Sequence, residues 1–369
     1  SLPLYLHVIR RLTSLIRLKK NIFFRQMLEC KIVILVTGGA GYIGSHTCIE
    51  LIEQGHEIVV VDNLINSTLQ AISRIEVITG KSVAFVEGDV RDEVFLCNIF
   101  TKFQIESVIH FAGLKSVGES NNHPLKYYDN NISGMLTLLK VMGDHGCKNL
   151  VFSSSATVYG SPAKLPVAET APLSALNPYG RSKLIIENIL DDVYLADGLW
   201  NIAVLRYFNP VGAHSSGLNG ESPNNIPNNL FPIISEAAIG QRGFVDIYGS
   251  DYPTNDGTGV RDYIHVMDLA RGHISALKMF SKGGCIFRVN LGTGKGYSVL
   301  EIIIEFERVS GRKVPYKIVE RRTGDSAACY ADVTYAKKLM GWSSEISLTQ
   351  MCEDQWRWQC HTLSENIPD

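Results

Sequence analysis

The chain has 369 residues, of which 45% are hydrophobic and 20% are charged, and its formal net charge is -2. This composition is typical of a soluble globular protein with a substantial core. The 35 basic and 37 acidic residues nearly balance, which argues against bulk attraction to nucleic acid or to an anionic membrane. No uninterrupted apolar run is long enough to span a bilayer.

The cysteines and histidines exclude several kinds of metal and redox site. The eight cysteines are dispersed without a Cys-x-x-Cys pair, which gives no support to a zinc ribbon or a redox motif. We expect a reducing compartment, the cytoplasm, although spacing alone leaves a disulfide open. The ten histidines do not cluster with carboxylates at metal-ligand spacing, so we expect no metal.

The first segment differs from the rest of the chain. Residues 1–28 contain no Asp or Glu and six Arg or Lys residues, as organellar transit peptides do. The segment is poor in serine, however, and Met27 lies just before the first clear strand. We expect residues 1–30 to be an upstream extension outside the fold rather than a targeting signal.

A strand, a glycine-rich turn, a helix and a second strand follow. They are expected, in this order, at residues 31–37, 38–44, 45–54 and 57–61. Glycines at 38, 41 and 44 permit a tight turn and let the backbone approach a pyrophosphate at the helix N-terminus. Asp62 ends the second strand, where a carboxylate binds ribose hydroxyls and repels a 2′-phosphate. The pattern predicts an NAD site.

Further β/α units extend the same sheet. Strands are expected at 83–86, 107–111, 150–153 and 202–206, with a helix from about 127 to 141. Asp89 follows the first of these strands, where we expect it at the adenine edge. Small residues, Ala112 and Gly113, end the second strand and suit a cofactor that runs along the sheet edge.

Tyr179 and Lys183 form the candidate catalytic pair. Pro178 predicts a helix start, and the two residues then lie one turn apart on the same face. An ammonium near a phenol favours the phenolate, which can take a proton from an alcohol. Taken alone, the pair is more often an accidental helical contact, and the rest of the chain has to decide. Ser155, at a strand end, is either a second hydroxyl donor or an ordinary cap.

The second half of the chain carries a candidate phosphate site. A long loop rich in Gly, Asn, Ser and Pro spans residues 215–229, and a helix start is expected at 226–230. A short strand is expected at 245–249. Arg261 and Arg322 are candidates to bind a phosphorylated ligand, because a guanidinium grips phosphate with two hydrogen bonds. Surface ion pairing is the alternative.

These motifs together resemble the extended short-chain dehydrogenase/reductase family. The resemblance rests on Thr37 to Gly44, on Ser153 to Ser155 and on Tyr179 to Lys183. It implies an α/β fold with a Rossmann-type doubly wound parallel sheet and a smaller C-terminal α/β substrate-binding domain. The domains are expected at 31–206 and 207–369, with some segments of the second returning to the sheet. It also implies Ser155, Tyr179 and Lys183 as the catalytic set.

Further blocks, at 111–115, 153–160, 206–214 and 257–268, are similar to the UDP-glucose 4-epimerases of this family. The similarity runs from about Lys31 to the C-terminus. By this resemblance, the NAD site also includes the glycine turn and Tyr42, Ile43, Gly44, Asp62, Asn63, Asn66, Ser67, Asp89, Val90, Phe111, Ala112, Gly113, Lys115, Asn130 and Phe208. The UDP-sugar site includes Asn209, Asn229, Leu230, Asp246, Ile247, Tyr248, Arg261, Arg322, Asp325 and Cys329.

The resemblance implies C4′ epimerisation of UDP-glucose and UDP-galactose through a 4-keto sugar, and a homodimer. One alternative is a sugar-nucleotide dehydratase. Elimination needs an extra acid and base, and such enzymes resemble Thr-Asp-Glu where this chain has Ser155-Ala156-Thr157. A non-catalytic NAD-binding protein is a second alternative. Many bacterial relatives carry a tyrosine where Cys329 stands, so we expect a larger sugar pocket that also accepts N-acetylated UDP-sugars, unless neighbouring side chains refill the space.

Overall fold

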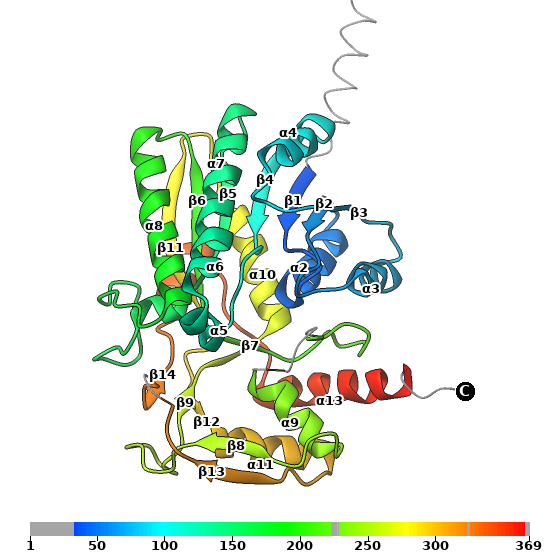
Figure 1. Ribbon diagram of the computed structural model, residues 1–369, viewed down its shortest axis with the longest axis vertical. Helices are drawn as coiled ribbons and strands as arrows, with labels where there is room; N and C mark the ends of the chain where they lie inside the picture. Colours follow the sequence, from blue (N-terminus) through cyan, green and yellow to red (C-terminus); the bar gives the residue numbers. More distant parts are fainter. Residues whose placement is uncertain (1–32, 223–226, 228, 323–324, 366–369) are drawn as a thin grey trace, which may run out of the picture.

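The structure is a computed structural model that describes residues 33–222, 227, 229–322 and 325–365 (Figure 1). The extension expected at residues 1–30 lies outside the described residues. No helix among the described residues is long and apolar enough to cross a membrane.

A central sheet of parallel strands organises the molecule. Its seven strands stand in the order β3-β2-β1-β4-β5-β6-β11. Short runs of apolar, mainly β-branched residues form most of them, as buried parallel strands require. Their bounds are β1 Val33–Thr37, β2 Glu57–Asp62, β3 Ala84–Glu87, β4 Ile105–His110, β5 Asn149–Ser155, β6 Asn201–Tyr207 and β11 Cys285–Leu291. The expected α/β fold with a doubly wound parallel sheet is confirmed.

Helices cover both faces of this sheet. Alternate residues of β1 divide between the two cores: Ile34 and Val36 pack on one face and Leu35 on the other. The first face is covered by α2 Tyr42–Glu53, α3 Leu69–Thr79, α10 Val266–Leu277 and α12 Thr334–Met340. The second face is covered by α4 Glu93–Lys102, α7 Gly134–Asp144 and α8 Pro178–Ala196.

The strand order reverses between β1 and β4, which are neighbours although β2 and β3 intervene in the sequence. Open α/β sheets bind ligands in the crevice outside the carboxyl ends of such strands. Short helical segments follow β4 and β5 in the sequence. They are α5 Val117–Asn122, α6 Pro124–Tyr128 and the π-helical turn η1 Asp129–Ser133 after β4, and the 3-10 turn η2 Ala156–Tyr159 after β5. The helix expected from about 127 to 141 is therefore α6, η1 and α7 in succession.

Small sheets form the C-terminal half. Figure 1 shows them grouped with α9, α11 and α13 beyond the end of the sheet toward which the central strands point. β7 pairs with β10, β8 with β13, and β9 with both β12 and β14. Their bounds are β7 Asn209–Val211, β8 Val245–Tyr248, β9 Val260–Arg261, β10 Tyr263–His265, β12 Tyr297–Ser298, β13 Tyr316–Val319 and β14 Ala328–Cys329, with α9 Leu230–Ala238, α11 Val299–Ser310 and α13 Leu348–Glu365.

Candidate active site

The turn between β1 and α2 has the geometry of a phosphate cradle. Gly38 has a φ of +72°, and a Cβ there would lie 2.6 Å from the Ala112 nitrogen. A Cβ on Gly44 would lie 2.3 Å from the Gly38 carbonyl oxygen. Gly41 precedes α2, and no side chain caps this helix. The bare turn and the uncapped helix N-terminus fit the pyrophosphate of a dinucleotide.

Asp62 ends β2 and is almost fully buried beside this turn. Its carboxylate accepts hydrogen bonds from the Ala40 nitrogen at 3.1 Å, the Leu64 nitrogen at 2.9 Å and Ser67 Oγ at 2.8 Å. The carboxylate is therefore held rigidly at the edge where a ribose would lie, and Ser67, a predicted NAD contact, acts on it directly.

The residues predicted near the adenine lie close to one another. Asn63 donates to Asp89 at 3.2 Å. Arg91 binds the same carboxylate at 2.8 Å, and its hydrogen bonds are the main cause that lowers the pKa of Asp89 to about 2. Val90 is buried against Gly134. Asn66 is an exposed residue of the loop after β2.

The segment after β4 closes the other side of the crevice. The Phe111 and Ala112 nitrogens donate to the Thr37 carbonyl at the end of β1, at 2.9 and 3.1 Å. A Cβ on Gly113 would lie 3.8 Å from Lys183 Nζ. The predicted cofactor edge and the predicted catalytic lysine thus meet at Gly113. Asn130 lies in η1 and donates to its neighbour Asn131 at 3.1 Å.

Ser155, Tyr179 and Lys183 lie close together at the start of α8 and the end of β5. Asn177 caps α8 through the Gly180 nitrogen at 2.8 Å, so the helix begins just before Tyr179. Ser155 ends β5, and its hydrogen bonding acts on the Tyr179 phenol. Lys183 lies over the Tyr179 ring, with Nζ 6.0 Å from the ring centroid.

The electrostatics of Tyr179 differ from the expectation. Burial raises the pKa of Tyr179, while hydrogen bonding to Ser155 and the charge of Lys115 lower it in part. Lys183 donates instead to the Ser153 carbonyl at 2.7 Å, and burial lowers its pKa to about 8. Lys115 is therefore a second ammonium that favours the phenolate, beside the expected Lys183, which lies at the Tyr179 ring.

A buried ion pair lies beside α8, the helix that carries Tyr179 and Lys183. Arg206 Nη2 lies 2.6 Å from Glu187 Oε2, and both side chains are 1% exposed. Ser154 Oγ donates to the same carboxylate at 2.5 Å, and Arg206 Nη1 donates to Tyr159 at 2.9 Å. The charge of Glu187 raises the pKa of Lys183 against the effect of burial. Glu187 thus joins α8 to the ends of β5 and β6.

In the second half, Arg261 and Cys329 stand opposite each other. β9 and β14 pair with Arg261 in register with Cys329. Arg261 Nη2 lies 3.8 Å from Asp325 Oδ1, so two predicted ligand residues face each other in a loose ion pair. Cys329 packs on a small apolar cluster that contains Val158 and Phe208. This cluster connects the predicted sugar contact to the segment that follows Ser155.

β8 and the loop after β13 bring further predicted residues together. The Arg322 guanidinium lies 3.7 Å from the centroid of the Tyr248 ring. Asp246 lies 3.3 Å from Lys317 Nζ. Ile247, backbone included, is 1% exposed and belongs to the apolar core of the second half.

The remaining predicted residues lie at two places, directly after β6 and at the start of α9. The Phe208 nitrogen donates to the Leu291 carbonyl of β11, at 3.1 Å. Asn209 donates to the Asp262 carbonyl through its backbone at 3.0 Å and through its side chain at 2.9 Å. Asn229 precedes Leu230, the first residue of α9, but does not cap this helix. Its side chain donates to Glu221 instead.

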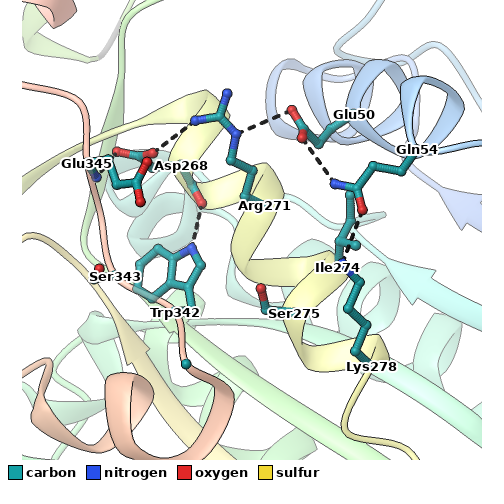
Figure 2. Close-up of a pocket in the computed structure, with 11 residues that line it drawn as sticks. Glu50, Gln54, Asp268, Arg271, Ile274, Ser275, Lys278, Trp342, Ser343 and Glu345 are labelled. Atoms are coloured by element: carbon teal, nitrogen blue, oxygen red, sulfur yellow. Dashed lines mark hydrogen bonds and ion pairs between the residues drawn. The ribbon is translucent and has the colours of Figure 1, made fainter.

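A separate cavity of about 240 Å³ lies between α2, α10 and residues 341–345. Figure 2 shows that its charged residues bind one another: Arg271 lies 3.5 Å from Glu50 and 3.4 Å from Asp268. Lys278 donates to Gln54 at 3.3 Å. No predicted site residue lines this cavity. It is a cavity lined mainly by polar and charged side chains between α2 and α10, and it is not the candidate active site.

Two residues with contacts to this site were not predicted. Glu187 follows Tyr179 and Lys183 at the same four-residue spacing, so the helical period contained a signal for it. Glu221 binds both Lys115 and Asn229. It lies in a long loop of mostly small polar residues, where no sequence pattern marks it.

Comparison with known proteins agrees with this geometry. A family described as GDP-mannose 4,6 dehydratase matches residues 35–355. UDP-glucose 4-epimerase of Bacillus subtilis is 55% identical over 331 residues, which cover 90% of this chain and 98% of the relative. UDP-glucose 4-epimerase of Dictyostelium discoideum is 58% identical over 328 residues, which cover 88% and 95%.

A solved structure shares the whole fold. UDP-glucose 4-epimerase of Bifidobacterium longum, in complex with NAD+ and UDP, superposes with a TM-score of 0.87 at 52% identity. The match covers 90% of this chain and 99% of that one. The relatives and the matching family together show that the chain belongs to the nucleotide-sugar family of GDP-mannose 4,6 dehydratase and, within it, to the UDP-glucose 4-epimerases.

Proposed function

We propose that this protein interconverts UDP-glucose and UDP-galactose by inverting C4′ of the sugar through a 4-keto intermediate. The observation that carries the proposal is the meeting of Ser155, Tyr179 and Lys183 at the end of β5, beside the cofactor edge at Gly113. Curated relatives at 55% and 58% identity are UDP-glucose 4-epimerases, which supports the same reaction here.

Tyr179 is the base in this proposal. It takes the proton of the sugar 4′-hydroxyl and later returns it, while Ser155 hydrogen-bonds the same oxygen. Burial raises the pKa of Tyr179, so the phenolate needs nearby positive charge. Lys115 supplies part of that charge. Lys183, whose pKa is about 8, still carries charge at neutral pH and lies at the Tyr179 ring.

The glycine turn, Asp62 and the edge from Phe111 to Gly113 fit NAD, which solved relatives contain. NAD, when bound, supplies the hydride acceptor and donor and a positive charge at its nicotinamide ring. Lys183 is proposed to hold the nicotinamide ribose. Asp62 binds the adenosine ribose, and its negative charge disfavours a 2′-phosphate.

The second half anchors the nucleotide while the sugar turns. Arg261 and Arg322 are proposed to bind the UDP phosphates, because a guanidinium can bind a phosphate with two hydrogen bonds. Arg261 now donates to the Val260 carbonyl at 2.9 Å and forms a loose ion pair with Asp325, and Arg322 lies over the Tyr248 ring. Anchoring at the UDP end supplies binding energy remote from C4′. Weak contacts to the sugar then allow it to present either face.

Dehydration fits this site less well than epimerisation. The stretch Ser155-Ala156-Thr157 has no carboxylate to act as the extra acid or base. In the structure, Thr157 donates to Ser155 Oγ at 3.0 Å, so this position supports the serine. The family model bears a dehydratase description, and this pair of residues distinguishes the present chain from that chemistry.

The direct test is incubation of purified protein with UDP-galactose and measurement of UDP-glucose without added NAD. Turnover is expected, because NAD is regenerated in every cycle and acts as a bound cofactor. Formation of a 4-keto-6-deoxy sugar would identify a dehydratase. No turnover by protein that contains NAD would identify a non-catalytic NAD-binding protein.

We also infer that the protein is a homodimer formed through helices of the first half. Exposed apolar side chains support this inference: Leu125 of α6 is 80% exposed, Leu136 of α7 is 50% exposed and Ile185 of α8 is 38% exposed. α6 contacts α8, so two of these residues lie on packed neighbours. Sedimentation equilibrium of the wild type and of Leu136→Glu tests this assembly.

A cytoplasmic location and a boundary between the two units near residue 206 complete the proposal. The seven cysteines in the described part of the chain are free thiols, which supports a reducing compartment. Fractionation of cells that express the chain tests the location. Limited proteolysis tests the boundary.

A further inference from the structure

Glu221 connects the two halves of the site. It lies in the loop between β7 and α9, and its side chain is 9% exposed. Its Oε1 accepts a hydrogen bond from Lys115 Nζ at 2.9 Å and one from Asn229 Nδ2 at 2.7 Å. Asn229 Nδ2 also lies 2.9 Å from Oε2. One carboxylate therefore binds a residue predicted to contact NAD and a residue predicted to contact the UDP-sugar.

The backbone of Glu221 is fixed by α13. Its carbonyl oxygen accepts a hydrogen bond from Trp358 Nε1 at 3.2 Å. A Cβ on the preceding Gly220 would lie 2.4 Å from Cγ of the Trp358 ring, so the chain here passes against the indole. The Glu221 backbone is thus held against α13, while its carboxylate reaches Lys115 and Asn229.

Lys115 is fixed from the other side. Asn131 accepts from the Leu114 nitrogen at 2.8 Å and donates to the Leu114 carbonyl at 3.1 Å. The same amide donates to Ser182 Oγ of α8 at 3.0 Å. The backbone before Lys115 is therefore tied to the helix that carries Tyr179. What remains to be set is the direction of the lysine side chain, and Glu221 sets it.

The charges of this group act on one another. The Lys115 side chain is 58% exposed, and the charge and hydrogen bond of Glu221 raise the pKa of Lys115 above its ordinary value. Lys115 in turn lowers the pKa of Tyr179 against the effect of burial. The carboxylate keeps the ammonium charged and in place, and the ammonium favours the phenolate.

Asn229 responds to the same carboxylate. A residue before a helix commonly caps it with its side chain, yet Asn229 does not cap α9. Its amide nitrogen is bound by Glu221, which fixes which way the amide faces.

We propose that Glu221 is a positioning residue for the epimerisation: it holds the Lys115 ammonium within electrostatic reach of Tyr179 and orients the Asn229 amide in the UDP-sugar site. The proposal rests on the proposed function, because the roles of Lys115 and Asn229 belong to that function. It predicts that one carboxylate affects both kcat, through Lys115, and the KM for UDP-galactose, through Asn229.

The pH profile separates this role from a simple effect of charge. If Glu221 acted on Tyr179 only as a negative charge, its removal would lower the pKa of the phenol and shift the acid limb of kcat/KM to lower pH. If it holds Lys115 in place, its removal releases the ammonium, and the acid limb shifts to higher pH.

The experiment compares the NAD-containing wild type with Glu221→Gln, Lys115→Met, the double variant and Glu93→Gln, using UDP-galactose. Glu93→Gln is the matched control, because Glu93 binds Lys140 in an exposed pair at 2.7 Å and is not one of the predicted site residues. We expect Glu221→Gln to lower kcat/KM at least about tenfold, the effect of losing a hydrogen bond to a charged group. We expect the acid limb to move upward, and the kcat loss to be largely absent in the Lys115→Met background.

Wild-type kcat and KM in Glu221→Gln, a downward shift of the acid limb, or additive kcat losses in the double variant would each overturn the proposal. Thermal unfolding of each variant identifies a folding defect. If Glu221→Gln fails to fold, Glu221→Asp, which keeps the charge but shortens the reach, replaces it in the same cycle. Absence of turnover by the wild type would overturn the proposed function itself, a different result from turnover that Glu221→Gln leaves unchanged.

Discussion

In the first half of the molecule, Ser155, Asp62 and Gly113 stand at or just beyond the ends of parallel strands in one seven-stranded sheet. In the second half, Arg261 and Arg322 stand in a two-residue strand and in a loop. Exposure follows the same division: Ser155 is 9% exposed and Lys183 5%, whereas the side chains of Arg261 and Asp325 are 23% and 39% exposed.

The difference has a physical reason. Proton transfer requires groups held within hydrogen-bond reach, and a packed sheet edge holds them with little freedom. Anchoring a diphosphate requires charge that can adapt, and partly exposed arginines retain that freedom at a low desolvation cost. In the proposed function, the first half would hold the reacting groups rigidly, and the second would bind the diphosphate through side chains that contact one another in this structure.

The largest effect should come from the rigid half. Tyr179→Phe removes the proposed base and keeps the ring, so kcat for UDP-galactose should fall by about a hundredfold to ten-thousandfold. NAD content, measured after denaturation, should stay near that of the wild type. Near-normal turnover by Tyr179→Phe would show that the geometry of this half does not perform the chemistry.

Cys329 lies at the contact between the halves and tests pocket size. The wild type should convert UDP-GlcNAc, and Cys329→Tyr should lower that activity by about tenfold to two-hundredfold through steric exclusion. Activity on UDP-galactose should change little. Cys329→Ala is the control and should keep both activities. A wild type inactive on UDP-GlcNAc would mean that neighbouring side chains fill the space.

A substitution at Lys183 measures how much the buried charge of this residue lowers the free energy of unfolding. Burial lowers the pKa of Lys183 from 10.5 to about 8, so below pH 8 folding buries a charged amine and is less favourable. Lys183→Met should raise the free energy of unfolding at pH 7 by about 1 to 3 kcal/mol while abolishing turnover. Chemical denaturation at matched NAD content measures this.

The pH dependence of the stability of the wild type and of Lys183→Met separates the effect of charge from that of packing. Between pH 8 and 10.5 the unfolded lysine binds more protons than the folded one, so wild-type stability rises relative to Lys183→Met. The difference in the free energy of unfolding between the wild type and Lys183→Met should disappear by about pH 10.5. A gap that is constant with pH would assign the difference to packing rather than to charge.

The smallest effect should come from the adaptable half. Arg322→Met should raise the KM for UDP-galactose about tenfold with little change in kcat, because the lost contact binds substrate and transition state alike. Arg321→Met is the matched control: its guanidinium binds Asp251 at 2.7 Å and lies over Tyr252. Equal effects of both substitutions would reject a specific phosphate contact at Arg322.

The sequence predicts the first half more completely than the second. The glycine turn, Asp62 and the spacing of Tyr179 and Lys183 are local patterns, and each needs only one strand or one helix to position it. The repeated β/α units predicted the parallel sheet, and the family resemblance implied its doubly wound character. What the pattern could not supply was the partner of Lys183, because the Ser153 carbonyl that it binds depends on how α8 lies against β5.

The second half depends on contacts remote in sequence. Arg261 meets Cys329 through strands of two residues each, which are too short for any periodic signal. Glu221 reaches Lys115 over a separation of 106 residues. The burial of Ile247 follows from the core of α9 and α11, which the strand pattern alone does not reveal.

The edge strand β11 has a consequence for protein engineering. It comes from the later part of the chain, yet it pairs in parallel along the full length of β6 in the central sheet. A fragment that stops after β6 would expose that strand as an unpaired edge, which invites aggregation. A chimera that exchanges the sugar-binding half between two relatives would need to take residues 285–291 from the same parent as the rest of the sheet. Such a chimera therefore needs more than one crossover point along the chain.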